Sequence, residues 1–153
     1  MPSKRELTES GQSQQQTIGN YENAVFVSYA WGGESEHIVD ELEHSFSKRN
    51  IHIVRDKKDI GYKSSIEAFK QRIGQKPFIT LIISDKYLRS EYCMFEFIEI
   101  DKNRTLRERV FPIVLPDANI YEPSGRLTYI KYWDGKIEQL SQAIKQVKSI
   151  TNL

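Results

Sequence analysis

Residues 78–97 read FITLIISDKYLRSEYCMFEF, an apolar run followed by a polar turn and by a mixed segment that starts at Ser90. Between Phe78 and Ile83 only Thr80 is polar, so side chains on both alternating faces are suited to burial. A continuous run of this kind, rich in β-branched residues, is typical of a parallel strand covered on both sides. We expect a helix to follow from around Ser90. This segment therefore predicts a buried parallel strand that leads into a helix.

The rest of the chain repeats this alternation of short apolar runs and longer amphipathic segments. We predict four further strands, at residues 24–29, 51–54, 110–115 and 127–133. We predict further helices at residues 35–49, from Ser64 or Ser65 to about Ile73, and at residues 136–150. Right-handed crossovers then favour an α/β fold, a flavodoxin-like, doubly wound, five-stranded parallel sheet of order 2-1-3-4-5 with helices on both faces. Ligands bind such sheets at the carboxyl edge, so the loops after the first three strands form the candidate site.

The bulk composition places the chain among globular proteins. Of its 153 residues 39% are hydrophobic and 28% charged, and the net charge of +1 gives no general attraction to nucleic acid or to an anionic membrane. No apolar run is long enough to span a bilayer. The one cysteine, Cys93, cannot form an internal disulfide, the histidines lack metal spacing, and we expect a cytoplasmic protein with no bound metal. Residues 1–23 are polar and predict a flexible arm, and residues 24–153 predict one folded domain.

Three segments carry a resemblance to a known family. They read VFVSYA at residues 25–30, RDKKDIGYKSSI at residues 55–66 and LIISDKYLRSEYCMFEF at residues 81–97. Together they resemble the first strand, the second loop and the third strand with its following helix in TIR (Toll/interleukin-1 receptor/resistance protein) domains of the bacterial type. The third is the most specific, because Ser90, Cys93 and Glu96 keep the family spacing after an apolar strand. In two departures from the pattern, Tyr92 replaces a common tryptophan and Gly61 lies nearer its strand than usual.

The resemblance implies an enzyme that cleaves NAD between nicotinamide and ribose, with Glu96 as the catalytic carboxylate. NAD is then the substrate, and neither a cofactor nor a metal is needed. The products are ADP-ribose or a cyclic ADP-ribose isomer. The residues that the resemblance places around NAD are Ser28, Tyr29, Ala30, Trp31, Asp59, Ser84, Tyr92 and Cys93. The chemistry suits one carboxylate, which stabilises the positive charge that develops on the ribose.

Each of these residues also has a plain structural interpretation. Glu96 can be one acid of a solvated helix face. Trp31 and Tyr29 can clamp the nicotinamide or adenine ring, but Tyr29 can equally pack at the edge of the sheet. Asp59 can simply solvate its loop. The helical setting of Cys93 indicates a packed thiol rather than a nucleophile.

Three other functions compete with NAD cleavage. A TIR domain can act as a non-catalytic adaptor that only joins like domains, but the presence of Glu96 disfavours this function, because a pure adaptor has no need for it. A response-regulator receiver shares the architecture, but it needs an acidic pair after the first strand, where this chain has Ser28-Tyr29-Ala30. A nucleoside-transferring glycosidase of similar fold is the more distant alternative.

The resemblance also implies control by assembly. We expect activation by TIR–TIR self-association, with the second loop moving to complete the pocket. We further expect that the chain is the N-terminal part of a longer protein with a fused or separate sensor or effector domain. A role in innate immunity, antiviral defence or virulence signalling fits this organisation.

Overall fold

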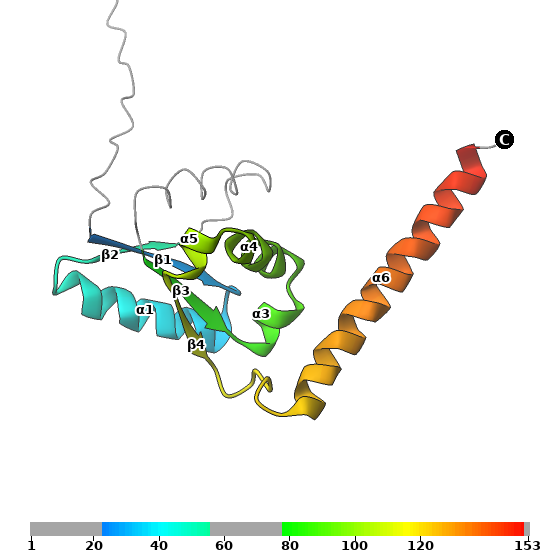
Figure 1. Ribbon diagram of the computed structural model, residues 1–153. Coiled ribbons are helices and arrows are strands. Elements are labelled where there is room, and N and C mark those ends of the chain that lie inside the picture. Colours follow the sequence, from blue (N-terminus) through cyan, green and yellow to red (C-terminus); the bar gives the residue numbers. More distant parts are fainter. Residues whose placement is uncertain (1–22, 56–77, 152–153) are drawn as a thin grey trace, which may run out of the picture.

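The structure is a computed structural model, and it describes residues 23–55 and 78–151. Four parallel strands form one sheet in the order β2-β1-β3-β4 (Figure 1). The strands are β1 (Ala24–Tyr29), β2 (His52–Arg55), β3 (Phe78–Ile83) and β4 (Val110–Val114). The helices are α1 (Gly33–Ser47), α3 (Asp85–Arg89), α4 (Glu91–Lys102), α5 (Arg104–Arg107) and α6 (Pro123–Thr151). The predicted order of the first four strands is therefore confirmed, and the helix predicted at 64–73 lies outside the described residues.

Helices cover the sheet on two sides, α1 on one face and α4 with α5 on the other (Figure 1). The interior on the α1 side is built from Val27, Tyr29, Val39, Ile82 and Leu115. The interior on the α4 side is built from Phe26, Ile79, Leu81, Ile100 and Leu106. Both lists draw alternate residues from β1 and β3, as the two-residue repeat of a strand requires. The central strand β3 is consequently buried on both faces, as its apolar run predicts.

Short polar side chains start the helices that follow β3. Ser84 Oγ accepts a hydrogen bond from the amide of Tyr87 at 3.0 Å, and Ser90 Oγ accepts one from the amide of Cys93 at 3.2 Å. Each hydroxyl satisfies an amide that has no carbonyl partner inside its helix. The sharp junction at Ser90 turns the chain so that α4 runs back across the sheet. The predicted helix start at Ser90 is confirmed.

The predicted fifth strand, residues 127–133, is wrong, because this segment belongs to α6. Tyr129, Tyr132 and Trp133 have helical spacing and all meet α3. The Tyr129 hydroxyl donates to Asp85 Oδ1 at 2.9 Å. The Tyr132 hydroxyl and Trp133 Nε1 donate to the backbone carbonyls of Arg89 and Leu88 at 3.2 and 2.9 Å. Those carbonyls end α3 and lack helical partners, so the helical conformation of α6 satisfies groups that a strand would leave unpaired.

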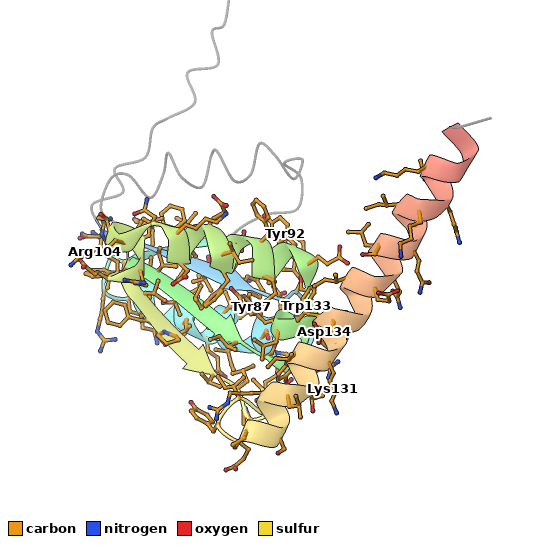
Figure 2. The ribbon with its side chains drawn as sticks, turned by 45° about the vertical axis from the view of Figure 1, so that its right-hand side comes forward. Tyr87, Tyr92, Arg104, Lys131, Trp133 and Asp134 are labelled. Carbon is orange, nitrogen blue, oxygen red and sulfur yellow. The ribbon has the colours of Figure 1, made fainter. Side chains whose placement is uncertain are left out.

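A close backbone approach fixes the first turn of α6. A Cβ atom on Gly125 would lie 1.9 Å from the backbone oxygen of Asn119, so only glycine fits there. From this point α6 runs along α3 and then extends away from the sheet (Figure 1). Figure 2 shows Trp133 where α6 meets the rest of the domain. Within the described ranges no helix has both the length and the apolar character needed to cross a membrane.

Candidate functional site

A chain of three buried polar side chains lies between β1 and α4. Ser28 Oγ donates to Glu96 Oε2 at 2.5 Å, and the hydroxyl oxygens of Ser28 and Tyr87 are 3.3 Å apart. A serine hydroxyl has one proton, and Glu96 accepts it, so the Tyr87 hydroxyl must donate to Ser28. Both hydrogen bonds, from Tyr87 to Ser28 and from Ser28 to Glu96, therefore point toward the carboxylate of Glu96.

Burial distinguishes Glu96 from the other acids of its helix. Glu96 is 4% exposed, whereas Glu91 is exposed and Glu99 is half-buried. The interpretation of Glu96 as one acid of a solvated face is therefore wrong. Removing a carboxylate from water is costly unless hydrogen bonds replace the lost hydration, and the Ser28 hydroxyl supplies such a bond.

The fold brings these groups together at the carboxyl edge of the sheet. Ser28 is next to the end of β1, and Tyr87 follows the end of β3, which pairs with β1. Helix α1 covers one face of the sheet and α4 covers the other (Figure 1). Because Glu96 on α4 accepts a hydrogen bond from Ser28 near the carboxyl end of β1, it lies where the crossovers diverge. This is the position at which doubly wound sheets bind ligands. Ala30, Tyr87 and Cys93 form a small buried cluster at the same place.

Burial raises the pKa of Tyr87 above its ordinary value, and the nearby Cys93 and Glu96 add to the rise. The phenol therefore stays protonated and keeps donating to Ser28 at neutral pH. A raised pKa in the folded state stabilises the protein below the unfolded value of 10.0, and this stabilisation is lost as the pH rises above it.

We predict that Tyr87→Phe flattens the alkaline loss of stability. Above pH 10 the buried tyrosine should contribute a fall of about 1.4 kcal/mol per pH unit in the free energy of unfolding, and phenylalanine cannot. At neutral pH the variant should lose only about 1 kcal/mol, for one hydrogen bond. Urea unfolding at a series of pH values from neutral to strongly alkaline measures both effects. An identical alkaline slope in the two proteins contradicts the prediction.

The loop after β1 is fixed at both ends of its turn. Gly32 and Gly33 have positive φ angles of 83° and 66°, a region that other residues rarely adopt. The amide of Gly32, the N-cap residue of α1, donates to Glu36 Oε2 at 3.1 Å, so a side chain of the helix holds the start of that helix. On the other side, Lys86 Nζ donates to the backbone oxygen of Trp31. The loop is therefore tied to α1 and to α3.

Glu36 also joins β1 to β2. Its Oε1 accepts a 3.0 Å hydrogen bond from the Tyr29 hydroxyl and pairs with Arg55 Nη1 at 3.1 Å. Arg55 additionally pairs with Asp40 and Glu43 on α1. Burial, and then the hydrogen bond to Glu36, raises the pKa of Tyr29. These contacts lie on the α1 face of the sheet and hold the ends of β1 and β2 in place.

Several of the predicted site residues lie close to Glu96 or support the residues that do. Ser28, Ala30 and Cys93 lie with Glu96 on the α4 face, and Tyr92 precedes Cys93 in the first turn of α4 (Figure 2). Ser84 is buried and caps α3, so it supports Tyr87.

The remaining predicted residues do not join this cluster. The side chains of Tyr29 and Trp31 pack with the interior on the α1 face, so the structure does not bring their rings to Glu96. The packed interpretation of Tyr29 is the one its position supports. Asp59 lies outside the described residues.

Sequence reasoning missed two polar residues that organise this region. Tyr87 is fully buried and completes the chain to Glu96, and its place three residues after the capping Ser84 is the signal that could have revealed it. Glu36 holds the loop after β1, and an acid in the first turn of a helix without a side-chain cap is the corresponding signal. Among the described residues no group of three or more His, Cys, Asp or Glu could hold a metal ion.

Comparison with protein families identifies the fold. The family described as TIR domain matches residues 25–147. The chain belongs to this family, which supports a TIR-based signalling function. Neither the curated proteins nor the solved structures give a significant match.

Proposed function

We propose that this TIR domain cleaves NAD at the bond between nicotinamide and ribose, with the Glu96 carboxylate as the catalytic group. The observation that carries the proposal is the burial of Glu96 at the carboxyl edge of the sheet, where two aligned hydroxyl groups orient it. A carboxylate that serves only solubility stays on the surface. The carboxylate of Glu96 is instead buried, where the effective dielectric constant is lower than in water and its charge acts more strongly on a nearby group.

The reaction needs few parts. As the bond between ribose C1′ and nicotinamide N1 breaks, its electron pair neutralises the pyridinium nitrogen, and the ribose becomes an oxocarbenium ion. Glu96 stabilises that cation by its charge. Water then forms the new bond at C1′ and releases a proton, which gives ADP-ribose. Attack by a nucleophile within the ADP-ribose gives a cyclic isomer instead, so both kinds of product follow from the same cation.

Access to Glu96 requires a change in its surroundings. Only 4% of the residue is exposed, so a nucleotide reaches the carboxylate when neighbouring side chains shift. TIR domains commonly self-associate, and contact between copies is a way to drive such a shift. We therefore propose that activity is controlled by assembly, in cytoplasmic immune, defence or virulence signalling, with sensor or effector domains as the source of the trigger.

The direct test is nicotinamide release from NAD by the purified chain. We predict that turnover per domain rises severalfold or more as the protein is concentrated or crowded on beads, because assembly supplies the active arrangement. Chromatography of nicotinamide and of the nucleotide product measures the rate and identifies the product. Equal turnover per domain across a wide dilution range contradicts control by assembly, and no turnover even on beads contradicts the enzymatic function.

The second candidate function is a non-catalytic adaptor that joins like domains. The exposed apolar side chains of α6, at residues such as Ile137 and Leu140, favour it, because such surfaces mark interaction sites. The NAD assay separates the two functions, since an adaptor associates without releasing nicotinamide.

A further inference from the structure

The second half of α6 carries an apolar stripe that nothing in the described part of the domain covers. Its members are 47–63% exposed: Ile137, Leu140, Ile144 and Val147. Both views show this half of the helix extending away from the sheet and from α4 (Figures 1 and 2). Isolated apolar side chains are ordinary on a surface, but four on one helical face form a contiguous strip.

The spacing of the stripe is that of a coiled-coil seam. The steps between its members are three, four and three residues, which is the alternation of the a and d positions in a heptad. Isoleucine occupies a at 137 and 144, and Leu140 and Val147 occupy d. The same frame places Trp133 at d, where α6 is fastened to α3, so the seam begins where the contact with the domain ends. A strip of this kind buries itself against another helix with the same repeat.

We infer that a second copy of this chain covers the stripe, with the two α6 helices antiparallel and a two-fold axis at Gln142. In this register Ile137 meets Val147 of the second copy and Leu140 meets Ile144. The two-fold axis makes each of these contacts occur twice in the dimer. The contact is isologous, so it closes at a dimer. This inference deepens the self-association in the proposed function and rests on it, because it assigns that association to a surface.

The residues beside the seam select the antiparallel direction. The exposed Asp134 and Lys148 both occupy e positions, which face each other across an antiparallel pair, and the register above places Asp134 opposite Lys148 twice. Ser141 and Ala143 then meet their own copies at the axis, where small side chains let the helices approach. A parallel pair instead places Asp134 opposite Tyr129 and Lys148 opposite Ala143, and neither charge gains a partner. Opposite charges beside a seam are what set direction and partner choice.

The seam is short, since residues 137–147 span about 15 Å of helix. We therefore expect association that depends on protein concentration rather than a permanent dimer. Such a contact raises the local concentration of the TIR domains while leaving their own surfaces open to one another.

The first test is the mass of the full chain in solution, with no NAD present. Sedimentation equilibrium from about 1 to about 200 µM should show the mass rise from 17.9 kDa to twice that value. The paired variant Leu140→Ser with Ile144→Ser should remain monomeric over this range. Its matched control is Gln139→Ser with Gln142→Ser, which places the same residue type on the opposite face and should still dimerise. A monomer at all concentrations, or a dimer that survives the seam variant, overturns the inference.

A second pair of measurements fixes the direction without depending on helix stability. Ala143→Cys should form an intermolecular disulfide on mild oxidation, whereas Gln142→Cys on the outer face should not; the unsubstituted chain, whose Cys93 is buried, supplies the background. Asp134→Lys and Lys148→Asp should each weaken association several-fold, and the two together should restore it. Equal crosslinking at 142 and 143, or no restoration, overturns the antiparallel register. All these readouts are independent of NAD, so loss of the enzymatic function leaves them unchanged.

Discussion

Replacing Glu96 with glutamine is expected to lower the rate of nicotinamide release by about a hundredfold or more, with the fold intact. The amide keeps the size of the side chain, and its oxygen can still accept the hydrogen bond from Ser28. What the substitution removes is the negative charge. The expected loss equals a few kcal/mol of transition-state stabilisation, which is the usual contribution of a group that faces a developing charge.

Charge is the decisive property because the leaving group needs no acid. Nicotinamide departs from NAD as a neutral base, so proton donation contributes nothing to bond breaking. The protein can therefore speed the reaction mainly by stabilising the positive charge that develops on the ribose. A carboxylate 4% exposed acts through surroundings that screen its charge poorly, so its effect there exceeds that of a surface acid.

The matched control is Glu91→Gln, which removes one charge from the same helix at an exposed position. It should leave the rate within about twofold, because solvent screens that charge. Glu96→Ala should be as inactive as Glu96→Gln, with an added loss of stability from the cavity and from the Ser28 hydroxyl left without its acceptor. Rates should be compared at equal assembly, on beads, with circular dichroism to verify folding. Wild-type turnover by both Glu96 variants rules out chemistry at this carboxylate.

The central, parallel position of β3 was predictable because a strand buried on both faces is apolar at nearly every position. Apolar runs such as residues 78–83 have no polar face, and in a protein of this size that requires a central parallel strand. Even Pro112 does not break the pattern, because β4 ends the strand order among the described residues and can do without one amide bond.

The failure at residues 127–133 has a specific cause. The segment is rich in aromatic and β-branched residues, which favours a strand by propensity alone. Its three-and-four spacing of Tyr129, Tyr132 and Trp133 favours a helix equally well. The helical conformation is favoured by the end of α3, because its backbone carbonyls without helical partners accept hydrogen bonds from this face of α6. That partner lies about 45 residues away in the chain and cannot be read locally.

The candidate site was predicted in position but only partly in composition. The motif after β3 located Glu96, and the end of β1 located Ser28. Because successive strand residues point to opposite faces, Ser28 and Tyr29 cannot both reach Glu96, and the structure assigns Ser28 to it. Sequence adjacency made the two appear equivalent. Only the direction of the strand relative to α4 separates them.

Leu81→Ala is expected to lower the free energy of unfolding by about 2–5 kcal/mol. Leu81 is 1% exposed and lies on β3 between β1 and β4, where it packs with Phe26, Ile100 and Leu106. Truncation removes buried methyl groups and leaves a cavity between the sheet and α4. Strands pair on both sides, so the backbone cannot collapse to fill it, which favours the upper part of that range.

Leu127→Ala is the matched control, since it makes the same chemical change at a position that is 47% exposed. It should cost less than about 1 kcal/mol, because little surface is buried and alanine is a good helix former in α6. Urea denaturation followed by circular dichroism, under conditions where all the proteins are monomeric, gives both values. Had residues 127–133 formed a strand inside the sheet, Leu127→Ala would cost as much as Leu81→Ala. The ratio of the two losses therefore tests the burial of β3 and the helical, outward position of Leu127 in a single comparison.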